Sequence, residues 1–275
     1  MIRIFKPKSK ILQNYVDLFY VLNNKESEKF SYAVFPHTHT CVSFIKGAEI
    51  TRANFQVNIL ADKKSVTNER IEVIGKYTNP VFVNYRGKIQ EVSIIFKPLG
   101  INHFINEDLK LITPDFSQSL NLPNWDLICN NIFKTQDDLK KMELIEEFLL
   151  DNLLDLNFDK LYKALAYLED IEKDYSIEDV AELIDLNLKT FQRLFSKHLA
   201  CSPLEYKRIS RFRQSLNAKL LSKEIKSLTE ISYESNFYDQ SYFIREFKKL
   251  TQLNPRKFFE SISILDEEKI IWSIK

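Results

Sequence analysis

Hydrophobic residues follow two different patterns along the chain, and the change comes near residue 98. Before it, short runs rich in β-branched and aromatic residues alternate with turn signals such as Pro36, Lys46-Gly47 and Asn79-Pro80. Several short runs at a spacing of roughly ten residues are typical of an antiparallel sandwich or barrel. We therefore expect strands at Phe30–Phe35, Cys41–Ile45, Phe55–Leu60, Ile71–Ile74, Val81–Tyr85 and Glu91–Phe96.

From about Ile101 the pattern becomes helical. Asp137 and Asp138 are expected to cap a helix over Leu139–Leu154, because apolar residues then recur on one helical face. That face contains Met142, Ile145, Phe148, Leu149 and Leu153, and acidic residues predict a solvated side at Glu143, Glu146, Glu147 and Asp151. Leu144, Leu150 and Leu154 widen the apolar face, so two interpretations stay open: the helix packs on the β-rich region, or it contacts a second copy of the chain.

The strongest pattern runs from Ser176 to Lys257 and is written twice. Phe191, Arg193, Phe195, Lys197 and Pro203 return 52 residues later as Phe243, Arg245, Phe247, Lys249 and Pro255. A repeat of two units is too short for a solenoid, which needs three or more units to bury a continuous core. Two copies instead indicate a domain that touches its target at two equivalent places.

Each copy predicts a short helix, a tight turn and a second helix. In the first copy Ser176 is the expected N-cap, and the second helix covers Leu188–Leu199. In the second copy Ser227 and Glu230 match a capping box, and the second helix covers Gln240–Leu250. This is helix-turn-helix geometry, in which the second helix enters the major groove of DNA.

The distribution of charge agrees with this interpretation. Residues 186–257 contain 15 Lys and Arg against 6 Asp and Glu, whereas the whole chain has a net charge of only +1. A local excess of basic residues is the electrostatic footprint of phosphate binding. A solvated helical surface is the simpler alternative, but basicity here coincides with the doubled motif and with Gln and Arg pairs that face outward.

Residues 158–260 resemble the DNA-binding domain of the AraC/XylS family of bacterial transcription regulators. The most diagnostic stretch is Ile231–Lys249 followed by Asn254-Pro255, and the first copy has the weaker match Phe191–Phe195 with Ser202-Pro203 and Tyr206. The sequence departs from the family pattern at Asn236 and Ala200, where glycine is usual, and at Ser232, where alanine is usual. Asn is the next best residue after glycine for a left-handed turn position.

The resemblance implies an α+β fold in which a cupin-like β barrel with a helical linker precedes an all-α domain with two helix-turn-helix units. The N-terminal part of the resemblance depends on the short motif Phe96-x-Pro98-x-Gly100. We expect residues 1–157 to form a sensing or dimerisation domain, residues 158–260 the DNA-binding domain, and residues 261–275 a tail. In this family the helix that corresponds to residues 139–154 often forms the dimer interface.

The implied function is a sequence-specific DNA-binding transcription regulator. Helical facing and the resemblance predict base contacts from Lys189, Gln192, Arg193, Gln240, Ser241, Ile244 and Arg245. Phosphate contacts are expected from Lys197, Arg208, Lys248 and Lys249. The joining helix, expected at Leu204–Leu221, would span about 25 Å and set the two reading helices roughly one DNA turn apart. For Arg193 and Arg245 the alternative is a bond to phosphate or to a neighbouring carboxylate.

The expected partners are double-stranded DNA, a second copy bound through the N-terminal domain, a small-molecule effector, and RNA polymerase if the output is activation. No apolar run is long enough to cross a bilayer, and Cys41, Cys129 and Cys201 are an odd number at wide spacings, so we expect a cytoplasmic protein without a membrane partner. An N-terminal domain that serves only in assembly is the alternative to an effector-binding one.

Catalytic residues, cofactors and metals are not expected. His37-Thr-His39 could place two imidazoles on one side of a strand, but Val42, Ser43 and Phe44 stand where a metal-binding cupin has its glutamate. The chain has no GxSxG, P-loop or GxGxxG motif and only 4 Gly. A metal enzyme of the cupin type fused to a DNA-binding module is therefore the weakest alternative.

Overall fold

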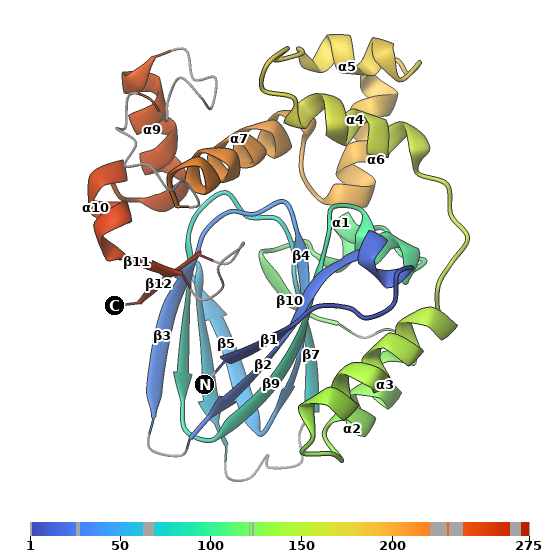
Figure 1. The fold of residues 1–275 in the computed structure, drawn as a ribbon, viewed down its shortest axis with the longest axis vertical. Coiled ribbons are helices and arrows are strands. Elements are labelled where there is room, and N and C mark those ends of the chain that lie inside the picture. Colours follow the sequence, from blue (N-terminus) through green and yellow to red (C-terminus); the bar gives the residue numbers. More distant parts are fainter. Residues whose placement is uncertain are drawn as a thin grey trace. The chain divides into compact units, whose positions relative to one another are not determined.

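The structure is a computed structural model that describes residues 2–25, 28–62, 69–120, 122, 124–220, 230, 239–264 and 271–274. The chain divides into two compact units (Figure 1). Unit 1 comprises Met1–Ser31, His39–Lys76 and Phe82–Asn157, and unit 2 comprises Tyr32–Thr38, Tyr77–Val81 and Phe158–Lys275. The fold is α+β, with a β-rich N-terminal part and a helical C-terminal part, as the sequence predicts.

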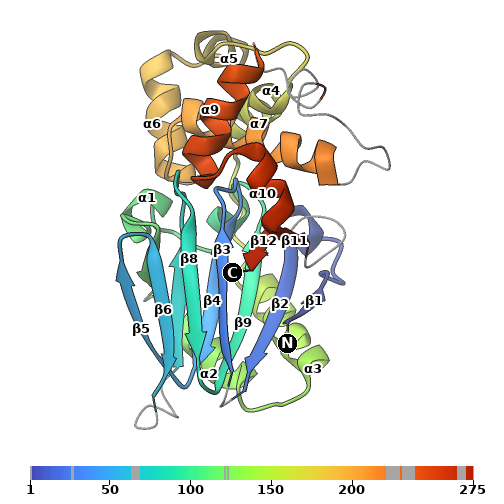
Figure 2. The same ribbon diagram turned by 90° about the vertical axis from the view of Figure 1, so that its left-hand side faces the viewer.

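Unit 1 is built on two sheets, whose strands are seen side by side in Figure 2. The first sheet has the antiparallel order β1 (Ile2–Phe5), β2 (Val16–Asn24), β9 (Ile89–Phe96), β4 (Thr40–Lys46), β7 (Glu69–Ile74) and β10 (Ser117–Ser119). The second contains β3 (Lys29–Val34), β8 (Val81–Arg86), β6 (Gln56–Ala61) and β5 (Ala48–Ala53), with β6 parallel to β8. All six predicted strands are confirmed.

The helices of unit 1 lie mainly after the sheets in the sequence. They are the 3₁₀ turns η1 (Leu12–Asn14) and η2 (Gly100–His103) and the helices α1 (Leu109–Ile112), α2 (Trp125–Ile132) and α3 (Asp138–Asp151). As predicted, the side chain of Asp137 caps α3 by accepting a hydrogen bond from the amide of Leu139. The apolar face of α3 is buried inside unit 1, where Phe148 packs edge-on against Trp125 at 5.4 Å.

Glu146 on α3 corrects one prediction. The acidic side of this helix was expected to be solvated, but Glu146 is only 8% exposed. Its two carboxylate oxygens accept hydrogen bonds from the backbone amides of Lys8 and Ser9, at 2.8 and 2.9 Å. The N-terminal segment therefore covers this side of α3, while Glu143, Glu147 and Asp151 are exposed as predicted.

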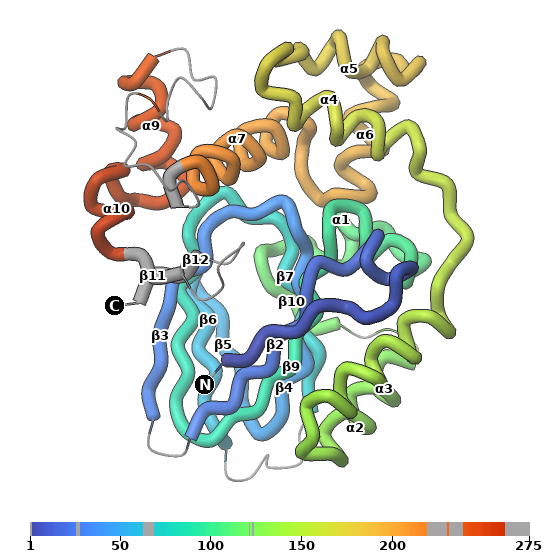
Figure 3. Tube along the Cα trace, viewed as in Figure 1, coloured from blue at the N-terminus to red at the C-terminus, as the bar shows by residue number. Residues whose placement is uncertain are grey.

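Unit 2 is mainly helical, and Figure 3 shows α7 running between the two groups of helices on either side of it. Its elements are α4 (Asp159–Glu169), α5 (Ile177–Leu183), α6 (Leu188–Leu199), α7 (Pro203–Leu220), α9 (Gln240–Thr251), α10 (Pro255–Ser261), β11 (Ile262–Ile264) and β12 (Ile271–Ile274). Ser176 caps α5 through a full capping box with Asp179. Residues 261–275, expected as a tail, contain β11 and β12, and β12 pairs with residues 32–34.

Some predictions for unit 2 fall outside the described residues. These are the capping serine Ser227, the helix expected after it, which contains Ser232, and the turn expected from Asn236. Within the described part of the chain, none of the helices combines the length and apolar character needed to cross a membrane.

We expect replacement of Glu146 by alanine to destabilise unit 1. The change leaves two backbone amides without their carboxylate acceptor, which should cost about 1–3 kcal/mol of the free energy of unfolding. Urea unfolding followed by fluorescence measures this loss. The matched control is Glu147→Ala, which changes an exposed neighbour and should stay within about 0.5 kcal/mol of the parent. Equal midpoints for the two variants would contradict the role of Glu146.

Candidate nucleic-acid interface

The sequence repeat is also a structural repeat. Helices α6 and α9 both contain 12 residues, and their N-caps Asn187 and Asp239 stand 52 positions apart. Each cap side chain accepts a hydrogen bond from the amide three residues on, at 2.8 Å from Thr190 and 2.7 Å from Tyr242. The two helices therefore begin in the same way.

The two helices also end in the same way. Their C-caps, Ala200 and Gln252, are again 52 positions apart and both adopt the left-handed conformation, with φ of 54° and 59°. Each amide bonds to the carbonyl oxygen four residues back, at Ser196 and Lys248. Ala200 stands where the family pattern has glycine, and it adopts the positive φ that the turn at the end of α6 requires.

Equivalent aromatic side chains form the core of each copy. In the first copy Phe195 meets Phe191 and Tyr206 edge-on, with both ring-centroid distances at 5.5 Å. In the second copy Phe247 meets Phe243 at 5.4 Å and Phe258 at 5.0 Å. All six rings are at most 1% exposed, so α6 and α9 are each held by their own buried aromatic cluster.

Helix α7 belongs to both clusters. Near its start Tyr206 packs in the first cluster, and its hydroxyl donates a 2.5 Å hydrogen bond to the carboxylate of Glu169 on α4. Burial raises the pKa of that carboxyl above its usual value. Six residues later Phe212 packs on Phe247 of the second cluster, at 5.2 Å. One helix therefore connects the two copies through side chains that are themselves core residues.

The predicted base-contacting residues lie on the outer sides of the two helices. On α6 the side chains of Lys189, Gln192 and Arg193 are exposed, opposite the buried rings. The corresponding side of α9 exposes Gln240, Ser241 and Arg245, and Ile244 is partly exposed. The structure thus brings each predicted set together on one helix face. Among the described residues, neither Arg193 nor Arg245 forms an ion pair with a carboxylate.

The predicted phosphate-contacting residues have different surroundings. Lys248 and Lys249 are exposed in the last turn of α9, and Lys197 is partly exposed at the equivalent end of α6. Arg208 lies on α7 instead, where its Nε atom is 3.8 Å from a carboxylate oxygen of Glu246. This ion pair connects two segments that are far apart in the sequence, so no local sequence pattern predicts it.

The two histidines of the His37-Thr-His39 motif fall in different units, with His37 in unit 2 and His39 in unit 1. His39 lies with its Nε2 atom 3.4 Å from the carboxylate of Asp17. The described part of the chain contains no group of three or more His, Cys, Asp or Glu side chains placed to hold an ion. Burial raises the pKa of Cys41 and Cys129 to about 12, so both thiols stay protonated at neutral pH.

Polar residues occupy the space between the two sheets of unit 1. Glu91 on β9 is 2% exposed, and its carboxylate accepts hydrogen bonds from Tyr20 and Ser93 of the first sheet and from Tyr85 of the second. This network cannot be predicted from the sequence, because its members come from three strands and a lone glutamate within an apolar run does not identify its partners.

A second buried carboxylate also accepts hydrogen bonds from both sheets. Glu72 on β7 is 3% exposed, and Arg52 on β5 of the second sheet donates to its carboxylate. Ser117 and Ser119 of β10 donate to the same carboxylate from within the first sheet. Glu91 and Glu72 are therefore buried carboxylates whose bonds to protein donors offset the cost of burial.

Comparison with known proteins divides the chain at nearly the same place. Residues 163–261 match a family described as a helix-turn-helix domain, and residues 4–116 match a family of domains of unknown function. The first match contains both copies of the repeat. The second covers most of the two-sheet region and gives it no activity.

Curated relatives are similar to part of the chain. An uncharacterised helix-turn-helix transcriptional regulator from Haemophilus influenzae is 28% identical over 45% of this chain and 40% of its own length. The transcriptional activator RhaS from an Enterobacter species is 30% identical over 38% of this chain and 37% of its own. The arabinose operon regulatory protein of Escherichia coli is 30% identical over 44% and 40%.

The chain spans about two fifths of the length of these relatives. The segment that matches the helix-turn-helix family contains the doubled caps, the paired aromatic clusters and the joining helix. Residues 163–261 are therefore similar to the helix-turn-helix domain family.

Proposed function

We propose that the protein is a sequence-specific DNA-binding transcription regulator that reads two adjacent major grooves, one with α6 and one with α9. The observation that carries the proposal is the structural repeat at an offset of 52 residues. The two helices share their length, caps and buried rings, and each exposes polar and basic side chains on the side opposite its core. A helix held in this way can enter a major groove.

The exposed side chains suit the edges of bases. Arginine can bond in a bidentate manner to guanine, and glutamine can do so to adenine. Each helix contributes an arginine at the equivalent position, Arg193 or Arg245, and a glutamine, Gln192 or Gln240. The lysines Lys197, Lys248 and Lys249 at the helix ends suit phosphates, which position the protein without reading sequence.

The length of α7 fits the distance between two grooves on one face of DNA. Its 18 residues correspond to about 27 Å of helix, to which the widths of the flanking helices add. One turn of DNA measures about 34–36 Å. A single copy of the chain can therefore place both reading helices on the same side of a duplex.

Removing one reading arginine should affect one half of the binding site. We expect Arg193→Ala to relax base preference in the block read by α6 and Arg245→Ala in the block read by α9. Each should cost about 1–3 kcal/mol of discrimination at one or two base pairs. Titration of base-substituted duplexes with each variant, followed by fluorescence anisotropy, measures this.

Lys249→Ala is the matched control, because it removes a positive charge from the end of α9. It should weaken binding to all sequences alike and lower the salt slope by about one. If both arginine variants instead weakened all sequences uniformly, the assignment of Arg193 and Arg245 to bases would be wrong.

We propose further that unit 1 joins two copies of the chain through the outer side of α3. Met142, Ile145 and Leu149 are buried within the unit, but Leu139 and Leu150 remain 54% and 38% exposed. Eleven residues are close to three helical turns, so these two leucines share one face. Exposed leucines aligned along a helix are suited to a helix–helix contact with a second copy.

Charge on this face should prevent that contact. The double variant Leu139→Glu and Leu150→Glu is expected to be monomeric at concentrations where the parent is dimeric, because the contact would bury carboxylates. Light scattering after size-exclusion chromatography measures the mass. Leu111→Glu, at an exposed leucine of α1, is the control that should remain dimeric. An unchanged mass for the double variant would place the dimer contact elsewhere.

Regulation by a small-molecule effector in unit 1 is part of the proposal, and contact with RNA polymerase follows if the output is activation. The polar residues between the sheets, with Glu91 and Glu72 among them, supply groups that a polar ligand could use. The alternative is a unit 1 that serves only in assembly. Full-strength DNA binding and full transcriptional output by purified protein without any added small molecule would favour that alternative.

A further inference from the structure

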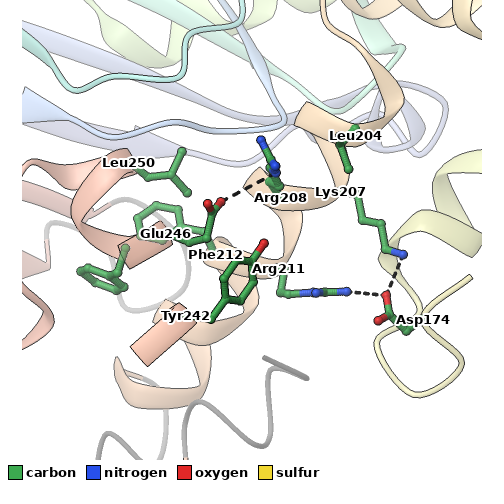
Figure 4. A pocket seen from close by; sticks show the side chains of 10 residues that line it. Asp174, Leu204, Lys207, Arg208, Arg211, Phe212, Tyr242, Glu246 and Leu250 are labelled. Atoms are coloured by element: carbon green, nitrogen blue, oxygen red, sulfur yellow. Dashed lines mark hydrogen bonds and ion pairs between the residues drawn. The ribbon is translucent and has the colours of Figure 1, made fainter. Parts of the chain in front are cut away.

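A small hollow in unit 2 contains charges from three different segments (Figure 4). It has a volume of about 190 Å³, and three basic side chains of α7, Lys207, Arg208 and Arg211, line one side of it. Asp174, from the loop between α4 and α5, and Glu246, from α9, face these cations. The loop that leads into the first copy of the repeat thus contributes one carboxylate, the second copy contributes the other, and the joining helix contributes the positive charges.

Asp174 attaches the first copy to α7. One of its carboxylate oxygens is 2.6 Å from the ammonium group of Lys207 and also accepts a hydrogen bond from Arg211, one turn further along α7. Lys207 donates a second hydrogen bond to the backbone carbonyl of Tyr175. The segment that leads into α5 is therefore bound at two successive residues to the same face of α7.

Glu246 attaches the second copy to α7. Its carboxylate is 3.8 Å from Arg208, and its side chain is only 14% exposed. Its sequence neighbour Arg245 is exposed on another side of α9. The ion pair therefore lies between α9 and α7, beside the contact of Phe212 with Phe247.

We propose that Asp174 and Glu246 are positioning residues that fix the distance and the rotation between the two reading helices by binding opposite copies of the repeat to α7. The proposal rests on the two-groove function proposed above. The aromatic clusters bury α7 in both copies, but apolar burial has no directional preference. Ion pairs at positions i, i+1 and i+4 of α7 select one rotation of the helix, because only one face presents all three cations.

The ion pairs are placed to govern geometry more than stability. The side chains of Asp174 and Arg208 are each 40% exposed, and partly exposed pairs contribute little to folding. Their removal should leave the aromatic clusters intact, so the variants fold and the consequence appears in DNA recognition. A wrong distance between the reading helices matters, because both must fit their grooves at once.

The test uses neutral variants of the full-length chain. Asp174 has a φ of +45°, and Asn tolerates that conformation, so Asp174→Asn removes charge with little backbone strain. It is combined with Glu246→Gln, which keeps the side-chain length. The control is Glu260→Gln, which removes an exposed carboxylate that pairs with Arg256 inside α10 and joins no two segments.

Binding is measured by fluorescence anisotropy on duplexes that carry the two sequence blocks at the optimal spacing and with one base pair inserted or removed. One base pair turns the second block by about 35° relative to the first. For the parent and for Glu260→Gln we expect a loss of affinity of about tenfold per base pair. For the double variant we expect the loss to fall to about threefold. An unchanged loss in the double variant would overturn the proposal.

A uniform gain of affinity at every spacing would also overturn it, because it would mean that Glu246 only competes with phosphate for Arg208. If the parent itself shows no dependence on spacing, the proposed two-groove function fails, and the positioning role is then decided without DNA. Spin labels at Lys189→Cys and Lys248→Cys, in a chain with Cys41→Ser, report the distance between α6 and α9. The positioning role predicts a broader distance distribution in the double variant, and an identical distribution would contradict it.

Discussion

The burial of one helix in two cores is the constraint on which the helical unit depends. Tyr206 and Phe212 are both 1% exposed, and they belong to different aromatic clusters although only six residues separate them on α7. Neither cluster is complete without its residue from α7. The two copies of the repeat are therefore not independent modules on a linker, because the helix that joins them is part of each core.

This constraint supports the proposed role of α6 and α9 as two short reading helices. Each of α6 and α9 begins at a side-chain cap, ends at a left-handed residue and buries two phenylalanines, and its outer side carries exposed polar residues. The orientation of each helix therefore depends on its packing against α7. The ion pairs of Asp174 and Glu246 with α7 complement the aromatic contacts, because they select one rotation of α7 about its axis.

Local signals made much of this fold predictable. The bounds of α6 were predicted to the residue, since Asn187 is a strong cap and the apolar spacing is regular. Six strands were predicted because each is a short β-branched or aromatic run between turn signals. β2 and β5 were missed, although β5 alternates between buried and more exposed positions, and the short, polar β10 gives no signal at all.

Contacts between residues distant in sequence were not predictable. Glu146 looked solvated because nothing near it indicates that the amides of Lys8 and Ser9 lie over it. The outer residues of the reading helices could be identified from helical periodicity, but the pairing of Arg208 with Glu246 could not, because it depends on how α7 and α9 pack. The polar network around Glu91 likewise needs three strands to be placed before its donors are known.

Selection of binding sites from random DNA by the purified full-length protein tests the central claim most directly. Reading by both helices predicts a recovered motif with two short blocks whose centres lie about one helical turn apart, roughly 10–10.5 base pairs. Recovery of a single block would contradict it, because only one of the two helices would then read sequence.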